Sequence, residues 1–331
     1  MKDLEISPLT TLSPTARHWL DTLVDRVNHV TALRVEASNR VFYRVDCRRL
    51  NQDQELVFMH SPPTLEANDR FVTLARLFAA NNVAVPLIIE ANFEAGFFLM
   101  TDLGRTHLEE TYGTPQQHPA LQAAIEGLTQ LANITDETAI EPYTQERFRF
   151  ELGIFSEWFL EAHLGRKEQS RGLVEATEPI IDAISVQPLC CVHRDYHCRN
   201  LLFENGQLGV VDFQDALRGP VLYDIASLLR DCYYQFDESQ VEAYLDTFLA
   251  LEHTQPLRDQ FDRPAIKRLF DFTAIQRQLK ALGIFARLSI RDGKDSHLVH
   301  IKPTLLRLVE LTAGYTELAN LNALLAECAK Q

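Results

Sequence analysis

The sequence predicts an α+β protein with two lobes, a small antiparallel sheet followed by a larger, mainly helical part. Two observations lead to this prediction. In the first hundred residues, short apolar runs typical of strands surround one helical segment. Beyond residue 104 the apolar residues keep helical spacing, except in an island of short strands near residues 189–211. We therefore place the lobes at residues 1–101 and 108–331, with a hinge at residues 102–107.

The first lobe is expected to begin with a helix at Ser13-Pro14, because serine is a good N-cap and proline suits the first helical position. Apolar residues continue at helical spacing as far as Val27. Asn92 and Gly96 are expected in the turn of a later hairpin. The remaining elements expected in this lobe are strands at 41–45 and 56–59, a helix at 65–80, and hairpin strands at 87–89 and 97–100.

The second lobe is expected to be helical apart from its strand island. Asn205-Gly206 is typical of a two-residue hairpin turn within that island. The elements expected here are helices at 120–131 and 145–164, strands at 189–192, 201–203 and 208–211, and helices from residue 220 almost to the end.

Composition and charge exclude some classes of partner. The chain has 331 residues, 46% of them apolar, and a formal net charge of −14. Nucleic-acid binding needs a basic face, so we expect no nucleic-acid partner. No apolar run approaches membrane-spanning length, and the first residues lack a signal-peptide layout. We therefore expect a cytoplasmic protein without a membrane partner, with its six cysteines reduced.

The segment His193–Asp212 has the residues and spacing expected for phosphoryl transfer. Asp195 follows an apolar run, Asn200 comes five residues later, and Asp212 ends the next strand pair. Phosphoryl transfer needs an aspartate to orient the attacking hydroxyl, and an asparagine with a second aspartate to hold Mg²⁺. We therefore predict Asp195 as the catalytic residue, Asn200 and Asp212 as metal ligands, and ATP and Mg²⁺ as cofactors.

These residues resemble the catalytic loop of the aminoglycoside phosphotransferase-like kinases, which are relatives of the protein kinases. His193 to Asn200 fit that family's H-x-D-x-H-x-x-N pattern. Asp212-Phe213-Gln214 stands where protein kinases have D-F-G. The run from Gly219 to Ala226 resembles the family's P-x-x-x-D-[IL]-A helix start, whose aspartate, here Asp224, usually braces the loop. The resemblance implies a protein-kinase-like fold.

A narrower resemblance is to the bacterial anomeric sugar kinases of cell-wall recycling. It lies in three patches, Ser38–Arg44, Met59–Pro63 and Gln276–Leu288. It implies a kinase that phosphorylates the anomeric hydroxyl of an amino sugar, N-acetylmuramate and/or N-acetylglucosamine, in peptidoglycan recycling.

The phosphate side of the ATP site departs from the protein-kinase pattern. Met59-His60 stands where the strand lysine is expected, and residues 37–40 contain no glycine. We expect Arg40 or Arg44, with backbone amides of residues 37–40, to replace these phosphate contacts, unless both arginines face solvent. The run Met100-Thr101-Asp102-Leu103 resembles the connector whose backbone binds adenine.

Substrate contacts are expected near Asp195. N-acetylmuramate carries a carboxylate, so its pocket should offer a cation. His197 is expected either to cap the loop or to approach the substrate, and Asp215 either to accept from a sugar hydroxyl or to cap a turn. The candidate cations are Arg218, Arg277, Lys280 and Arg287, although helical Arg277 and Lys280 also fit ordinary surface charges.

Two other functions remain open at this point. The first is a kinase of another small alcohol, such as an aminoglycoside or an amino alcohol. The second is an inactive nucleotide-binding regulator, which the missing lysine and glycine-rich loop favour. The presence of Asp195, Asn200 and Asp212 together favours an active enzyme.

Overall fold

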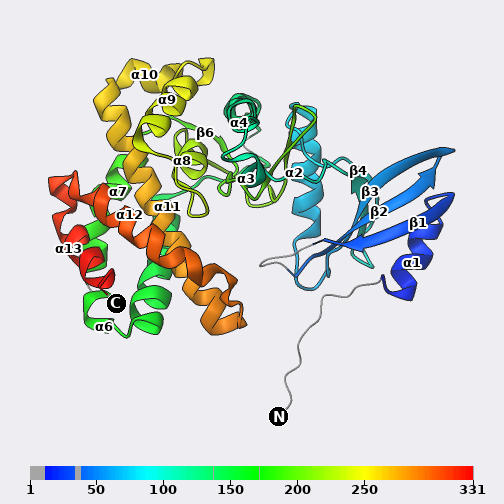
Figure 1. Ribbon diagram of the computed structural model, residues 1–331, viewed down its shortest axis with the longest axis horizontal. Coiled ribbons are helices and arrows are strands. Elements are labelled where there is room, and N and C mark those ends of the chain that lie inside the picture. Colours follow the sequence, from blue (N-terminus) through cyan, green and yellow to red (C-terminus); the bar gives the residue numbers. More distant parts are fainter. Residues whose placement is uncertain (1–11, 34–38, 137, 171, 331) are drawn as a thin grey trace, which may run out of the picture. The chain divides into compact units, whose positions relative to one another are not determined.

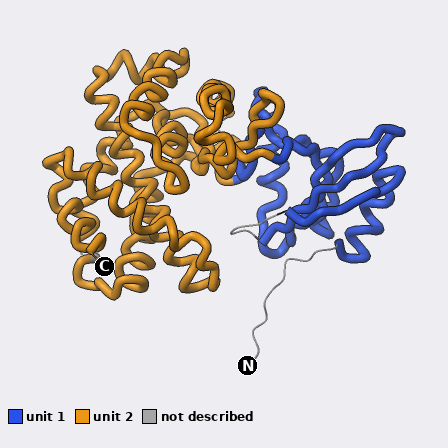
Figure 2. Tube along the Cα trace, in the orientation of Figure 1, with its two compact units in different colours: residues 1–105, 209–214 blue, residues 106–208, 215–331 orange. Residues whose placement is uncertain are grey.

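The computed structural model describes residues 12–33, 39–136, 138–170 and 172–330. The chain forms two compact units, residues 1–105 with 209–214, and residues 106–208 with 215–331 (Figure 2). The segment Gly209–Gln214, which carries Asp212, therefore belongs to the first unit although it comes late in the sequence. None of the helices in the described ranges is both long and apolar enough to span a membrane.

The first unit contains a five-stranded antiparallel sheet with strand order β1-β2-β3-β5-β4 (Figure 1). The register pairs Tyr43 of β2 with Phe58 of β3, and Phe58 with Leu99 of β5. The elements of this unit are α1 (Pro14–Asp21), β1 (Arg26–Ala32), β2 (Val41–Arg49), β3 (Gln52–His60), α2 (Asn68–Ala80), β4 (Ile88–Asn92) and β5 (Phe97–Thr101).

The two sides of β5 pack against different helices, which explains its unbroken apolar run. Phe97 contacts Trp19 of α1 at a ring distance of 5.7 Å. Phe98, on the other side of the strand, meets Phe71 of α2 edge-to-face at 5.9 Å. A strand buried on both faces needs apolar residues at every position rather than at alternate ones.

The predicted α+β class is confirmed, but one predicted element is wrong. The first helix begins after the Ser13 N-cap as expected, and ends at Asp21. The apolar spacing that extended it to Val27 is misleading, because Val27 lies in strand β1. The pairing of β1 with β2 shifts register between Val27 and His29, so β1 lacks the regular alternation that marks a strand.

The second unit is mainly helical, with short strands around the catalytic motif. β6 pairs with β9, and β7 forms a hairpin with β8, at whose turn Asn205 and Gly206 have φ of 51° and 78°. The elements from residue 106 onward are α3 (Leu108–Thr111), α4 (Gln117–Ala132), α5 (Gln145–Ile154), a π-helical segment η1 (Phe155–His163), α6 (Lys167–Ser170), α7 (Leu173–Ser185), β6 (Leu189–Val192), β7 (Leu201–Glu204), β8 (Gln207–Val210), β9 (Leu217–Pro220), α8 (Tyr223–Leu229), α9 (Glu238–Leu249), η2 (Glu252–Thr254), α10 (Gln255–Gln260), α11 (Arg263–Asp292), η3 (Asp295–His300), α12 (Ile301–Ala313), η4 (Thr316–Leu318) and α13 (Ala319–Cys328).

Helix α11 is the central helix of the second unit and packs against α5, η1, α7, α8 and α12. Asp262 caps its N-terminus by accepting from the Ala265 amide at 2.9 Å, and Gly293 ends it with φ of 66°. The helix buries polar residues as well as apolar ones, among them Gln276, Gln278 and Lys280. Since buried polar groups require partners, these side chains mark α11 as a candidate site element.

A close backbone contact fixes the position of α11 against α5 and η1. A Cβ atom added at Gly283 would lie 2.6 Å from the backbone carbon of Ile154 and the backbone nitrogen of Phe155. Real Cβ atoms do not approach backbone so closely, so only glycine allows this separation. By contrast, a Cβ atom added at Gly153, on the exposed side of α5, would meet no neighbour within 4 Å.

We expect Gly283→Ala to lower the free energy of unfolding by about 1–3 kcal/mol, because the methyl group forces two helices apart. The matched change Gly153→Ala should instead raise it by about 0.5–1 kcal/mol, through helix propensity alone. Urea denaturation of both variants measures these effects. Equal effects from the two substitutions would contradict the close packing at Gly283.

Candidate active site

The loop that carries Asp195 is held by a buried carboxylate from α8. Strand β6 ends at Val192, and Arg194 then takes a left-handed backbone conformation with φ of 78°. The carboxylate of Asp224 accepts hydrogen bonds from the backbone amides of His193 at 2.6 Å and Arg194 at 3.0 Å. These two bonds stabilise a backbone turn that a non-glycine residue rarely adopts.

The side chain of Arg194 is buried in an ion pair with Glu151 of α5. Its Nη2 lies 2.5 Å from Glu151 Oε1, and its Nη1 donates to the backbone carbonyl of Asp215 at 3.1 Å. Glu151 also accepts from the Tyr143 hydroxyl and, at 3.2 Å, from the Gln276 amide. Burial opposes ionisation of Glu151, but the charges of Lys280 and Arg194 outweigh it and lower its pKa.

Two cations of α11 lie beside the Asp195 carboxylate. Arg277 Nη2 is 3.8 Å and Lys280 Nζ 4.0 Å from Asp195 Oδ1. Desolvation would raise the pKa of Asp195, but Lys280 and Arg277 outweigh it and hold that pKa well below its ordinary value. Desolvation likewise disfavours the charged form of Lys280, yet Glu151 leads the charges that raise its pKa. Asp195 is therefore a carboxylate and Lys280 an ammonium at neutral pH.

Asn200 and His197 belong to the same loop as Asp195. Asn200 Nδ2 donates to the Asp195 carbonyl at 3.0 Å, which fixes the orientation of the asparagine amide. The His197 amide also donates to that carbonyl at 3.0 Å. The His197 ring meets Tyr233 edge-to-face at 5.3 Å.

Asp212 lies in the first unit, at the end of β8, in a left-handed conformation with φ of 65°. Its Oδ1 accepts from Gln214 Nε2 at 2.7 Å. The next residue, Phe213, is buried and stacks on Phe71 of α2 at 5.4 Å. Packing of Phe213 therefore anchors the backbone that presents Asp212.

The two arginines predicted to bind phosphate have different surroundings. Arg44 donates to both carboxylate oxygens of Asp102 and, at 2.6 Å, to the carbonyl of Gly104. Arg44 therefore ties β2 to the chain after β5. Arg40 is 4% exposed, its Nε donates to Ser61 Oγ at 3.2 Å, and its Nη2 lies 3.4 Å from Glu66.

The predicted connector residues Met100 and Thr101 end strand β5. Met100 is buried and pairs with Val57, and the Thr101 hydroxyl accepts from the Leu87 amide at 2.9 Å. Of the turn at residues 37–40, residues 37 and 38 lie outside the described part of the chain. The predicted role of the turn's amides therefore stays a prediction.

Of the predicted substrate cations, Arg277 and Lys280 lie beside Asp195. Asp215 contributes its backbone carbonyl to Arg194, and its side chain is exposed. Arg218 lines a pocket of about 120 Å³ together with residues such as Asp136 and Cys190, and Asp195 is not part of that lining.

Glu151 is a site residue that the sequence reasoning missed. A signal was present, since Glu151 follows Phe148 by three residues and precedes Phe155 by four, so it lies on the apolar face of the predicted helix. An acidic residue in that position requires a buried partner. The partner, Arg194, could not be read from helical spacing.

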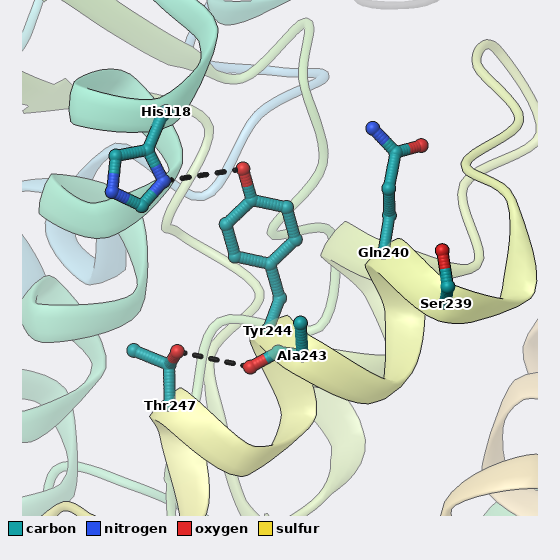
Figure 3. Close-up of a pocket in the computed structure, with 6 residues that line it drawn as sticks. All are labelled: His118, Ser239, Gln240, Ala243, Tyr244 and Thr247. Carbon is teal, nitrogen blue, oxygen red and sulfur yellow. Dashed lines mark hydrogen bonds between the residues drawn. The ribbon is translucent and has the colours of Figure 1, made fainter.

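A shallow pocket of about 310 Å³ between α4 and α9 is separate from this site. Figure 3 shows His118 of α4 facing Tyr244 of α9, with the ring nitrogen and the hydroxyl 3.5 Å apart. The other lining residues are Ser239, Gln240, Ala243 and Thr247. None of the predicted catalytic, metal-binding or substrate residues lines it.

We expect Asp224→Asn to lower the free energy of unfolding by about 1–3 kcal/mol, because an amide NH₂ would face one of the two backbone N–H donors. Asp182 of α7 is exposed, so Asp182→Asn is a matched control that should change stability by less than about 0.5 kcal/mol. Urea denaturation measures both. A stability loss no larger for Asp224→Asn than for Asp182→Asn would contradict the role of Asp224 in holding the loop.

Solved structures resemble this chain in fold. The ADP-bound crystal structure of aminoglycoside phosphotransferase APH(2'')-Ib superposes with a TM-score of 0.62, covering 88% of this chain and 97% of that one, at 15% identity. This likeness confirms a protein-kinase-like fold.

Sequence relatives cover nearly the whole chain. An N-acetylmuramate/N-acetylglucosamine kinase of Neisseria meningitidis serogroup B is 33% identical over 324 residues, 94% of each chain. One of Pseudomonas aeruginosa is 34% identical over 298 residues, 88% of this chain and 87% of the relative. Residues 29–290 match the model of the phosphotransferase enzyme family. The chain therefore belongs to the phosphotransferase enzyme family.

Proposed function

We propose that this chain is an ATP- and Mg²⁺-dependent kinase that phosphorylates the anomeric hydroxyl of N-acetylmuramate, N-acetylglucosamine or both, in peptidoglycan recycling. The observation that carries the proposal is the identity of 33% and 34% with two relatives named N-acetylmuramate/N-acetylglucosamine kinase. The loop around Asp195 supports the reaction class. The ADP-bound structural neighbour supports the use of a nucleotide.

In this proposal Asp195 accepts the hydrogen of the sugar hydroxyl and orients its oxygen toward the γ-phosphorus of ATP. Its carboxylate is kept ionised by Arg277 and Lys280, which lie 3.8 and 4.0 Å from Oδ1. Asp224 and Glu151 act as positioning residues, since they hold the backbone and side chain of Arg194 directly before Asp195. His197, Asp215, Arg218 and Arg277 stay candidates for contacts with the sugar.

Asn200 and Asp212 are the residues that we propose to hold Mg²⁺. The donor set fits, because Mg²⁺ prefers hard oxygen ligands from one or two protein groups and completes its shell with phosphate oxygens. Asn200 Nδ2 donates to the Asp195 carbonyl, and the amide oxygen is the atom that would bind a metal. When bound, Mg²⁺ neutralises phosphate charge.

For the nucleotide, we propose that Arg40 contacts the ATP phosphates and that the backbone of residues 100–102 binds adenine. Arg44 donates to Asp102 and Gly104, after β5. The ion pair of Arg40 with Glu66 would play the part that a lysine–glutamate pair plays in protein kinases. Arg44 would then position the connector by binding Asp102.

The substrate proposal is tested by ATP consumption with a panel of amino sugars, aminoglycosides, choline and ethanolamine, followed by ³¹P NMR of the product. We expect turnover of the amino sugars, with phosphate on the anomeric oxygen. Asp195→Asn should lower kcat by about 10²–10⁴-fold in protein that is still folded, because the hydroxyl loses its proton acceptor. Phosphorylation of another alcohol instead, or of another sugar oxygen, would contradict the proposal.

The nucleotide proposal is tested by Arg40→Gln. We expect the KM for ATP to rise by roughly 10–100-fold, because a charge-assisted contact with phosphate is lost. Arg105→Gln is the matched control, since Arg105 lies in the same unit and pairs with Glu55 at the surface. An unchanged KM for ATP in Arg40→Gln would remove Arg40 from the nucleotide site.

A further inference from the structure

Lys280 is a largely buried cation that makes no hydrogen bond to the residues that the structure describes. Lys280 is 8% exposed, and its ammonium group carries three N–H donors. The carboxylate oxygens beside it are Glu151 Oε1 at 3.7 Å and Asp195 Oδ1 at 4.0 Å, both beyond hydrogen-bond distance. Because a buried charge without hydrogen bonds is costly, the position of this lysine needs an explanation.

The charge of Glu151 stabilises the Lys280 ammonium, but Glu151 does not use the hydrogen-bond donors of that ammonium. The carboxylate of Glu151 already receives Arg194 at 2.5 Å, the Gln276 amide at 3.2 Å and the Tyr143 hydroxyl. Those three donors satisfy both oxygens of Glu151. The ammonium of Lys280 therefore has donors to offer to a further acceptor.

Arg277, the other cation beside Asp195, is different. Its Nη2 donates to the Arg194 carbonyl at 3.2 Å, so this side chain holds the backbone of the catalytic loop. Lys280 makes no such bond to the loop. Of the two cations near Asp195, Arg277 is thus bonded to the loop backbone, whereas Lys280 makes no hydrogen bond to the described residues.

We propose that Lys280 is a catalytic residue that donates a hydrogen bond to the acceptor oxygen as that oxygen attacks phosphorus. The proposal rests on the proposed kinase function and on the 4.0 Å between Lys280 Nζ and Asp195 Oδ1. One oxygen atom can lie about 2.7 Å from the carboxylate and about 2.9 Å from the ammonium at the same time. A sugar hydroxyl in that place would be held by both groups.

The chemistry balances with ATP as the co-reactant. The O–H bond of the acceptor breaks, and its proton passes to the Asp195 carboxylate and then to water. The acceptor oxygen forms a bond to the γ-phosphorus, and the bond from that phosphorus to the bridging oxygen breaks, leaving ADP. Lys280 stays protonated throughout and stabilises the negative charge that develops on the acceptor oxygen.

Two other roles for Lys280 predict different kinetics. If it bound the carboxylate of N-acetylmuramate, its loss would raise KM for that sugar and spare N-acetylglucosamine, which has no carboxylate. If it served only the fold, its loss would reduce stability without a specific effect on kcat. A contact with the reacting hydroxyl, which both sugars share, must lower kcat for both.

The test compares Lys280→Met with wild type on both amino sugars, at saturating ATP. We expect kcat to fall about 100-fold for each sugar, with KM changed far less, because one donor to a developing oxyanion is lost. Lys267→Met is the matched control on the same helix, where the lysine pairs with Glu238 and Asp271, and its kcat should not change. A rise in KM confined to N-acetylmuramate, or an unchanged kcat, would overturn the proposal.

If Lys280→Met does not fold, the proposal is tested with Lys280→Ala. Its kcat is measured with and without ethylammonium ions. Restoration of kcat that grows with ethylammonium concentration supports a missing ammonium at the reaction centre, and no restoration overturns it. Wild-type enzyme that phosphorylates neither sugar would refute the proposed function itself. Wild-type activity combined with an indifferent Lys280 variant refutes this inference alone.

Discussion

The geometry of the catalytic loop depends on the ion pair between Arg194 and Glu151. Arg194 is held at both ends, because its side chain meets Glu151 and its backbone amide donates to Asp224. Asp195 is the next residue, so these contacts fix the position of the backbone that carries its carboxylate. Removing one partner of such a buried pair typically costs about 3–5 kcal/mol, because the other charge is left uncompensated. Electrostatic balance inside the second unit therefore constrains the reaction centre before any ligand binds.

Two arginine–carboxylate pairs also lie in the first unit, Arg44 with Asp102 and Arg40 with Glu66. Arg44 has its donors on Asp102 and Gly104, which makes it part of the scaffold after β5. Arg40 is close to Glu66, Ser61 and the ring of Phe71, so its guanidinium is buried and oriented. Two arginines four residues apart thus have different partners.

How much of this could be predicted from the sequence depended on the range of the interactions. The motif around Asp195 is local, so its spacing could be read, while its catalytic role stays a prediction. The apolar period located most helices and strands. Strand β1 was missed because a register shift between Val27 and His29 breaks its alternation. Glu151 was missed because its partners come from distant segments. Arg218 lines a pocket to which Asp195 does not contribute, and its contact with the sugar stays a prediction.

The glycine contact of α11 has a consequence for the reacting groups. Gly283 meets the backbone of Ile154 and Phe155, so the rotational phase of the helix is set at that point. Lys280 lies three residues earlier and Arg277 six, which places them about one and two turns from the contact. Each residue of helix turns a side chain by about 100°, so a single inserted residue between positions 280 and 283 would swing both cations away from Asp195. The number of residues between Gly283 and the two cations therefore determines whether their charges lie beside the Asp195 carboxylate.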